Sequence, residues 1–482
     1  MQKKWQHQGQ EVRPFINKEM IWLILGLAWP TMLEQLMQTA VQYIDTAMVG
    51  SLGTQATAAV GATTTINWLI SSSIAALSIG FLAYIAKACG AGQTDLIKRA
   101  VAQTSLVVLI VGVFFTAATV GLSRQIPVWM QVDPSIQILA AKYFLILYAP
   151  MLFRTATILY GTVLRAAGDT KTPMKIGVVV NFINVVFNFL LIYPTRPFTL
   201  LNHLGFLKNA SVLYIPGAGL GVIGAALASA IAFVVGGIWM TIATFKHPIL
   251  SPKGQSLKPD WEILQPCLKI AFPNMLQRFA TSFGYVAFAS LINSIGEVAT
   301  AAHTIANTVE SAFYIPGYGM QTAAATLAGN AYGANDNKHM EELARMFLPI
   351  EIFLMIISGA SLFILAPELV QIFSKSDEVI QLGTTVLRMV AVSEPFYGFS
   401  IIVEGMMQGV GKTKEPFVYN ISGMWGVRII GTFITTQFLG MGLISAWACM
   451  IAHNMLLFML YLMSYIRKSW NPLAQLENVK KC

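Results

Sequence analysis

Residues 30–53, PTMLEQLMQTAVQYIDTAMVGSLG, carry the pattern that decides the fold, because it returns at residues 273–296 as PNMLQRFATSFGYVAFASLINSIG. The two stretches align without a gap at an offset of 243 (273 − 30). The same offset relates the turn GDTKTP at residues 168–173 to GKTKEP at residues 411–416. A duplicated hydrophobic bundle is a common design of secondary transporters, which hold the substrate path between the two halves. The repeat therefore makes transport the leading hypothesis.

The composition predicts a protein that lies mostly within a membrane. Of the 482 residues, 55% are hydrophobic and 11% are charged, and the mean hydropathy is +0.63. Twelve apolar stretches have the length of about 20 residues that a helix needs to cross the hydrocarbon. They cover residues 20–50, 55–86, 97–122, 135–164, 174–194, 216–245, 262–294, 298–331, 343–366, 378–407, 417–439 and 441–466. We expect an all-α integral membrane protein with twelve transmembrane helices in two pseudo-symmetric six-helix lobes.

The expected domain order follows from these stretches. A cytoplasmic N-terminal tail and an N-terminal lobe are followed by a cytoplasmic linker, a C-terminal lobe and a cytoplasmic C-terminal tail. Their ranges are 1–19, 20–245, 246–260, 261–466 and 467–482. The tail of 19 residues is polar and lacks the apolar core of a signal peptide. A polar connection at residues 195–215 is the one sizeable break in the repeat.

The basic excess indicates an orientation in the membrane. The net charge is +9, and with the N-terminus inside, the cytoplasmic segments contain 21 of the 31 Lys and Arg residues. This asymmetry follows the positive-inside rule. We therefore expect a multi-pass protein of the cytoplasmic (inner) membrane, with both termini in the cytoplasm and no nucleic-acid partner.

Enzyme and metal motifs are missing from the sequence. The four cysteines are far apart and form no C-x2-C pair, so neither a disulfide framework nor a zinc site is indicated. The chain has no H-E-x2-H, G-x-S-x-G or P-loop pattern. We predict no catalytic residues, no metal and no cofactor, and ATP-driven transport is disfavoured.

The first apolar stretch carries one stripe of polar side chains. On a helix that advances about 100° per residue, Glu34 and Gln38 project close to the direction of Asp45, with Thr31 and Gln42 nearby. A charge at the bilayer centre costs at least about 2.5–3.5 kcal/mol, so the stripe should face the bundle interior or a wet cavity. A carboxyl there stays charged by binding a cation or becomes neutral by taking a proton, and either event is a coupling step. The alternative is that Asp45 only caps a helix or pairs structurally.

The matching helix of the second half has lost both carboxyls. The equivalent positions hold Asn274, Gln277, Thr281, Tyr285 and Phe288. We therefore expect the ionisable site in the N-terminal half.

A second polar face in this half lies on the following helix, where His303, Asn307 and Glu310 are spaced at i, i+4 and i+7. The alternative for His303 is a hydrogen-bonded structural role, which is more common for a lone intramembrane histidine. Our candidates for the lining of a substrate cavity are Gln38, Gln42, Asn67, Gln277, Thr281, Tyr285, His303, Asn307 and Glu310.

Two intramembrane arginines are expected to act as structural counter-ions. Arg154 is expected to offset Asp45 or Glu34. Arg428 is expected to offset Glu404 or Glu310.

These features together resemble the multidrug and toxic compound extrusion (MATE) family. The first-helix pattern P-x3-E-Q-L-x2-T-x4-I-D-T-A-M-V-G-S-L-G, followed by AAVG, is similar to that of the family. The segment AAHTI from residue 301, with VES and IPGYG after it, resembles the eighth helix of bacterial members, and the paired turns match the family's cytoplasmic loops. The resemblance covers nearly the whole chain. It implies an antiporter that expels bulky, often cationic or amphipathic compounds in exchange for protons or sodium ions.

The resemblance also implies roles for single residues. Asp45 matches the first-helix aspartate that family members use for cation coupling. Asn184 and Asn188 match an Asn-x3-Asp pattern that supports this aspartate in some proton-coupled members, with Asn188 in place of the acid. The acids that other members carry on the seventh and tenth helices are absent. Glu34 is our own candidate for a second coupling carboxyl, because it shares a face with Asp45.

The predicted working unit is a monomer that alternates between inward-facing and outward-facing states. A drug binds while Asp45 is cation-free, and an external cation on Asp45 then displaces it. A proton is favoured over sodium because the additional acids of several known cation sites are missing. One alternative function is a flippase for a lipid-linked oligosaccharide or another lipid, and a third is a membrane-embedded enzyme. Twelve spans with an acidic stripe favour drug export over a flippase, and the missing catalytic motifs disfavour an enzyme.

Overall fold

The computed structural model describes residues 18–197 and 214–481, which are mainly helical. The helices of the N-terminal half are α1 (Lys18–Gly50), α2 (Thr54–Gly90), α3 (Thr94–Leu122), α4 (Gln125–Trp129), α5 (Gln137–Tyr148), α6 (Met151–Ala166), α7 (Lys171–Ile192) and α9 (Val222–Lys246). Those of the C-terminal half are α10 (Trp261–Asn293), α11 (Glu297–Phe313), α12 (Ile315–Gly333), α13 (Asn337–Phe373), α14 (Asp377–Ala391), α15 (Glu394–Gly409), α16 (Lys414–Ile421), the π-helix η2 (Ser422–Ile429), α17 (Ile430–Phe433), the π-helix η3 (Ile434–Phe438), α18 (Leu443–Ile466) and α19 (Pro472–Lys481).

These helices form twelve spans, six in each half, which confirms the expected architecture. By length and hydropathy, seven of the described helices can cross a membrane, and the bent pairs α5–α6 and α14–α15 raise this number to nine. The other three spans are α10, the α11–α12 pair and the run from α16 to η3. They are more polar or interrupted, because they carry much of the chemistry described below.

The fourth and tenth spans bend at equivalent positions. Helices α5 and α6 meet at 46° around Pro150, and α14 and α15 meet at 52° around Ser393, which is 243 residues later (393 − 150). Pro150 and Pro395 have no amide hydrogen to donate to the preceding turn, so a continuous helix is interrupted there. The repeat therefore extends to the shape of the backbone.

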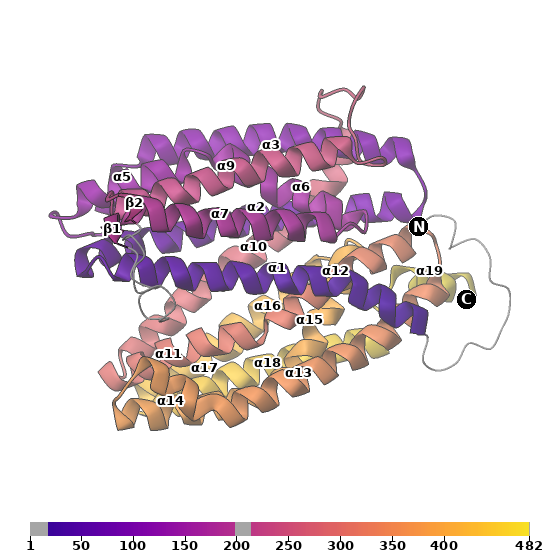
Figure 1. Ribbon diagram of the computed structural model, residues 1–482. Coiled ribbons are helices and arrows are strands. Elements are labelled where there is room, and N and C mark those ends of the chain that lie inside the picture. Colours follow the sequence, from indigo (N-terminus) through magenta and orange to yellow (C-terminus); the bar gives the residue numbers. More distant parts are fainter. Residues whose placement is uncertain (1–17, 198–213, 482) are drawn as a thin grey trace, which may run out of the picture.

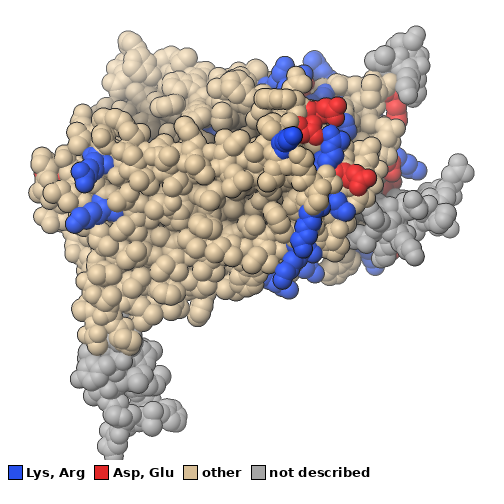
Figure 2. Space-filling view, turned by 90° about the horizontal axis from the view of Figure 1, so that it is seen from above, with Lys and Arg blue, Asp and Glu red and all other residues tan. Residues whose placement is uncertain are grey.

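The two halves form two helical bundles that meet at one end and diverge toward the other (Figure 1). Helix α19 and the start of α1 lie at the end where the bundles meet. On the face shown in Figure 2, most charged side chains gather at this same end, and a broad band in the middle carries almost none. Such a band matches the hydrocarbon of a bilayer, where exposed charge is costly.

The first helix of each half begins inside the core of the other half. Met20 and Ile24 of α1 pack among buried residues of α12, α13, α15 and α18. Their equivalents on α10, Ile263 and Cys267, pack among buried residues of α2, α3 and α6. Farther along, α1 packs on α7 and α10 on α16, so each helix crosses from one bundle to the other. The lobes are thus joined by the linker and also by the first turns of α1 and α10, each of which packs in the opposite lobe.

Two elements were not expected from the sequence. Strands β1 (Pro194–Pro197) and β2 (Tyr214–Ala218) pair antiparallel within the connection that we predicted only as polar, and the residues between them lie outside the described part. Helix α19 occupies the predicted C-terminal tail. Its Leu473 is buried, and the amide of Asn471, just before it, donates a hydrogen bond of 2.8 Å to Asn337 at the start of α13. The tail is therefore docked on the C-terminal lobe.

Candidate functional site

Asp45 lies at the end of a hydrogen-bond chain that joins α1, α7 and α9. The side-chain amide of Asn188 donates to Asp45 Oδ1 and, over 3.0 Å, to Asn184 Oδ1. Asn184 in turn donates to Ser229 Oγ over 3.1 Å. Both asparagines are buried, whereas Asp45 is half-buried. The three residues that the resemblance singled out therefore form one constellation.

One atom of this constellation is unsatisfied. Asn188 uses both amide hydrogens as donors, but its carbonyl oxygen is buried and has no partner among the described residues. Buried polar atoms normally have a hydrogen-bond partner, so an orphaned acceptor calls for an explanation. Beside a carboxyl, it is suited to a donor such as a protonated carboxyl, or to a cation. Within residues 18–197 and 214–481, there is no group of three His, Cys, Asp or Glu side chains that could hold a metal ion.

Arg154 does not pair with either N-terminal carboxyl. Its guanidinium donates hydrogen bonds of 2.6 Å to Asn67 Oδ1 and to Ser71 Oγ, both on α2, and lies 4.8 Å from the ring centre of Phe233. Asn67, a predicted cavity residue, is therefore held by an arginine. The counter-ion role that we expected for Arg154 is replaced by a link between α6 and α2.

Glu34 forms an ion pair that is distinct from the Asp45 site. Its carboxylate lies 2.9 Å from Arg165 Nη1 of α6, and the two side chains are only 13% and 17% exposed. The two carboxyls of the stripe share a face, but 11 residues separate them in sequence, which is about 16 Å along a helix. Sharing a face thus does not bring Glu34 and Asp45 together.

Of the remaining polar residues of the stripe, Thr31 is buried and its hydroxyl donates to the carbonyl oxygens of Ala28 and Gly319. The other two are open to their surroundings. Gln38 and Gln42 are exposed in the middle of α1, as expected for the wall of an open cavity. Next to them, the Tyr43 hydroxyl donates a hydrogen bond of 3.1 Å to the carbonyl oxygen of Thr308 on α11. This bond connects the two lobes beyond the point where α1 has crossed to its own bundle.

In the C-terminal half, amides hold the carboxylate of Glu404. Gln277 donates to Glu404 Oε1 over 2.9 Å, and Gln408 donates to the same oxygen over 3.1 Å. Arg428 lies elsewhere, 5.0 Å from the ring centre of Tyr285 and 4.1 Å from that of Phe288. The arginine is buried against aromatic rings on α10 and forms no ion pair with Glu404 or Glu310 within the described residues.

The face predicted on the eighth span is split between different environments. His303 packs edge-on against Phe288 and Trp447, with ring centres 5.5 and 5.9 Å apart, as a structural residue would. Asn307 is exposed and Glu310 is buried, whereas Thr281 on α10 is half-buried. These candidates therefore lie in different environments within the described part of the chain.

Glu310, which the sequence singled out, has two buried acidic counterparts that were not predicted as site residues, Glu351 and Glu394, on two other spans. The exposed fractions are 7%, 0% and 2%. Glu351 reaches α15 one turn after Glu394, where a Cβ atom at Gly398 would lie 3.3 Å from Glu351 Oε1. Both oxygens of Glu351 and one of Glu394 lack a hydrogen-bond partner in the described chain. The overlooked signal was a single acid within the apolar run LPIEIFLMI of α13.

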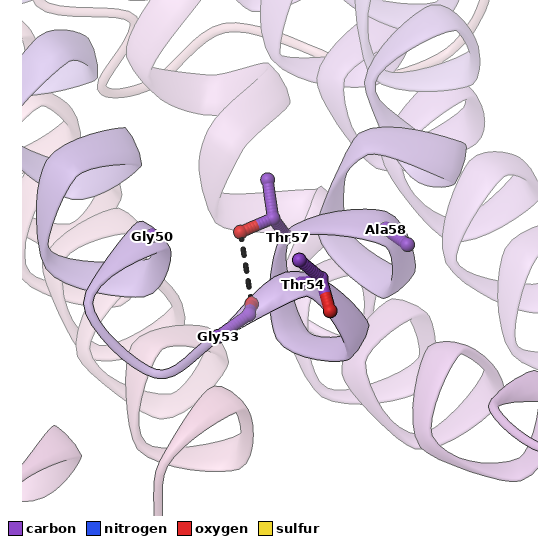
Figure 3. Close-up of a pocket in the computed structure, with 5 residues that line it drawn as sticks. All are labelled: Gly50, Gly53, Thr54, Thr57 and Ala58. Carbon is purple, nitrogen blue, oxygen red and sulfur yellow. Dashed lines mark hydrogen bonds between the residues drawn. The ribbon is translucent and has the colours of Figure 1, made fainter.

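Two cavities open at the outer ends of the lobes. One has a volume of about 450 Å³ and is lined by Gly50, Gly53, Thr54, Thr57 and Ala58, with a hydrogen bond of 3.1 Å from Thr57 Oγ1 to the Gly53 carbonyl (Figure 3). The other has a similar volume and surrounds the equivalent glycine, Gly296, at the start of α11. Asp45 lines neither cavity. The two cavities therefore lie at equivalent positions of the repeat and are separate from the coupling site.

The repeat and the fold both have counterparts among known proteins. The MatE family model matches residues 30–190 and 273–434, so it matches each half once, in step with the offset of 243 (273 − 30). The probable multidrug resistance protein NorM of Thermotoga maritima is 26% identical over 474 residues, covering 98% of this chain and 97% of its own. The probable multidrug resistance protein YoeA of Bacillus subtilis is also 26% identical, over 89% of this chain and 90% of its own.

Solved structures share the fold over almost the whole chain. A structure described as the outward-facing conformation of a multidrug resistance MATE family transporter of the MOP superfamily superposes with a TM-score of 0.82, at 22% identity, over 94% of this chain and 99% of its own. A second structure is of a MOP superfamily transporter from Pyrococcus furiosus, and its description says that the reverse polarity of its binding pocket suggests a different function. It also superposes with a TM-score of 0.82, at 23% identity, over 95% of this chain and 99% of its own.

Proposed function

The chain belongs to the MatE family, and we propose that it exports drugs and other small organic compounds in exchange for a cation that moves inward. Members of this family are transporters, so the protein is a multi-pass membrane transporter and not an enzyme. Relatives named as multidrug resistance proteins align with nearly the whole chain, which supports drugs as the substrate class. The distribution of Lys and Arg supports a location in the inner membrane with both termini in the cytoplasm.

The observation that carries the coupling proposal is the Asp45 constellation. Asp45 is half-buried on the stripe of α1, and Asn188 fixes one of its oxygens. The orphaned Asn188 carbonyl leaves a hydrogen-bond acceptor next to the carboxyl. Binding a proton or cation there satisfies this acceptor, and releasing it restores the negative charge. The carboxyl therefore has two states that differ in charge and in hydrogen bonding.

Exchange follows if these two states favour opposite conformations. The cation-free Asp45 holds a cationic or amphipathic compound while the cleft faces the cytoplasm. After the lobes rock, a cation from outside neutralises Asp45 and releases the compound. A ligand shifts such an equilibrium only if it binds the two conformations with different affinities. Competition between cation and compound for one charged group supplies this difference.

A proton is the coupling ion that fits these residues best. The constellation has one carboxyl, and its other members are neutral amides and a hydroxyl. A proton needs only one basic oxygen, whereas a bound metal cation needs several oxygen ligands and gains from more than one negative charge. Asn188 removes the second charge that an aspartate would provide at that position.

Transport in liposomes tests the proposal. The purified protein is reconstituted, and movement of the fluorescent organic cation ethidium is followed under a pH gradient without sodium, or under a sodium gradient at constant pH. We expect the pH gradient alone to drive accumulation. If only the sodium gradient drives it, the proton assignment is wrong, and if neither does, cation exchange is wrong.

A further inference from the structure

Helices α2 and α12 cross between the two lobes near their ends, where the bundles meet. Each helix carries a pair of small residues four positions apart at the crossing, Ala86 and Gly90 on α2 and Gly329 and Gly333 on α12. The two pairs are equivalent in the repeat, because both offsets are 243 (329 − 86 and 333 − 90). Small residues at this spacing allow two membrane helices to approach backbone to backbone. The crossing therefore joins the lobes without bulky side chains between them.

The contacts at the crossing are reciprocal. A Cβ atom at Gly90 would overlap the carbonyl oxygen of Asn330, and a Cβ atom at Gly333 would overlap the carbonyl oxygen of Lys87. Lys87 and Asn330 are themselves equivalent (330 − 87 = 243). At the centre, a Cβ atom on Gly329 would lie 2.7 Å from the Cβ of Ala86. The same contact is thus made twice, once from each lobe.

Two further interactions join the lobes close to this crossing. The Lys87 ammonium of α2 lies 4.7 Å from the ring centre of Tyr332 on α12. The Thr326 hydroxyl of α12 donates a hydrogen bond of 3.3 Å to the carbonyl oxygen of Arg165 on α6. Toward the far end of these spans the two bundles diverge (Figure 1), and the hydrogen bond from the Tyr43 hydroxyl to the Thr308 carbonyl oxygen runs between them. The two lobes are therefore packed backbone to backbone at the charged end of the molecule and diverge toward the other.

We propose that the crossing of α2 and α12 is the cytoplasmic seal of the transporter, and that Gly90 and Gly333 set the balance between its closed and open states. The proposal rests on the alternating exchange proposed above, which requires the cytoplasmic side to open. An added methyl group at either glycine is incompatible only with the closed crossing. An alanine there raises the free energy of the closed state and leaves the separated state unchanged, so the population moves toward the cytoplasmically open form.

Inter-lobe distances test this without any substrate or ion gradient. Spin labels are placed on cysteines introduced at Asp95 of α3 and Lys338 of α13, two exposed positions on opposite lobes, in an otherwise cysteine-free protein. Pulsed electron resonance then gives the distance distribution in detergent and in lipid nanodiscs. We expect one short distance in the parent protein. In Gly90→Ala and Gly333→Ala, we expect the ratio of long to short distances to rise at least about tenfold.

A matched control separates opening from general destabilisation. A Cβ atom at Gly237 of α9 would also overlap a backbone carbonyl, that of Phe153, but both residues belong to the N-terminal lobe. Gly237→Ala is expected to lower the thermal stability and to keep the short distance. Gly121→Ala on α3, where a Cβ meets no described atom within 4 Å, is expected to change neither.

A variant without added atoms covers the case in which the alanine proteins fail to fold. Tyr332→Ala removes the aromatic contact with Lys87 and creates no overlap, and a smaller shift toward the long distance is expected. An unchanged distance in folded Gly90→Ala and Gly333→Ala would overturn the proposal, as would equal opening in Gly237→Ala. An unchanged distance in Tyr332→Ala overturns it if neither alanine variant folds. The two proposals can fail separately. If the liposome assay shows no exchange but the alanine variants show the expected distance shift, the seal is supported and only the exchange function is wrong.

Discussion

The N-terminal and C-terminal halves place different chemistry at the same positions of one backbone. Glu34 and Arg165 form a partly buried ion pair in the first half. Their equivalents are Gln277 and Gln408 (offset 243), which instead donate to one carboxylate, that of Glu404. One half therefore connects its helices at this point with opposite charges, and the other with neutral amides around a single acid.

The coupling constellation shows a larger difference. Asp45 is replaced by Phe288 in the second half (288 − 45 = 243), and Phe288 packs against Arg428. Asn188 is replaced by Gly431, which lies against Cys449 (431 − 188 = 243). The buried acids described in the second half are instead Glu310, Glu351 and Glu394. Duplication thus preserved the scaffold while the polar residues diverged, so symmetry alone does not locate a site.

The largest effect is expected from breaking the ion pair. Arg165→Ala leaves the Glu34 carboxylate, which is only 13% exposed, without a partner. Losing one partner of a fully buried pair typically destabilises a protein by about 3–5 kcal/mol, and this partly exposed pair should lose somewhat less. The thermal unfolding temperature of the purified protein should fall, and the double variant Glu34→Gln with Arg165→Gln, which copies the amides of the other half, should recover much of the loss. Gln408→Ala, at the equivalent position, is the control and should lose much less. Equal losses at Arg165 and Gln408 would contradict the charge contrast between the halves.

The next effect is on coupling. Asp45→Asn removes the charge and keeps the shape of the side chain, so the gradient-driven transport rate should fall. We expect a fall on the order of 100-fold, because typical coupling free energies correspond to factors of up to about 150. The protein should keep its wild-type unfolding temperature within a few degrees. Ethidium accumulation in liposomes under a pH gradient measures the rate. Phe288→Leu, at the equivalent position of the other half, is the control and should keep coupled transport. Full coupling in Asp45→Asn would refute the assignment of Asp45 as the coupling residue.

A smaller effect, on the choice of coupling ion, is expected from Asn188→Asp. This change places a second carboxyl next to Asp45, in the position of the Asn-x3-Asp pattern, and increases the negative charge available to a metal cation. Sodium-driven ethidium transport at constant pH should rise by about tenfold, corresponding to about 1.4 kcal/mol of differential binding. Asn184→Asp, one turn away and bonded to Ser229, is the comparison variant. A sodium response that stays at the parental level would show that the identity of residue 188 does not select the ion.

The smallest effect is expected in the buried acids of the second half. An ionised carboxylate without a partner is very costly to bury, so Glu351 is expected to be neutral, and Glu351→Gln preserves both its shape and its charge state. The unfolding free energy should change by less than about 1 kcal/mol, as judged from thermal unfolding. Glu351→Lys, which forces a charge into the same place, should be strongly destabilised. A large loss in Glu351→Gln would mean that this acid is ionised and paired.

Sequence periodicity and hydropathy were sufficient for the scaffold. Spans need about 20 apolar residues in a bilayer, so their number and order were visible in the composition of successive stretches. The Asp45 constellation was accessible only because the resemblance connected α1 to Asn184 and Asn188, which lie far away in sequence. Contacts between helices depend on packing, which periodicity does not encode. For this reason Arg154 was matched with the wrong partners, and the neighbours of Glu34 were not foreseen.

Other features were missed because their signals are weak in one sequence. Glu351 is a single acid in an apolar run, and the next polar residue on its face is Ser358, two turns later. Gly90 and Gly333 occupy equivalent positions of the repeat, but the contact of each glycine with the other helix depends on how the lobes meet. The strands β1 and β2 are short and lie in a polar connection, where pairing is determined by the ends of the flanking helices.

The exchanged starts of α1 and α10 have a consequence for biosynthesis. The ribosome completes α1 long before it makes α12, α13 and α15, against which Met20 and Ile24 finally pack. During that interval these side chains can only face lipid or transient neighbours. Insertion of the first six spans therefore yields an unfinished intermediate, and assembly is complete only after the late helices have enclosed the beginning of the chain.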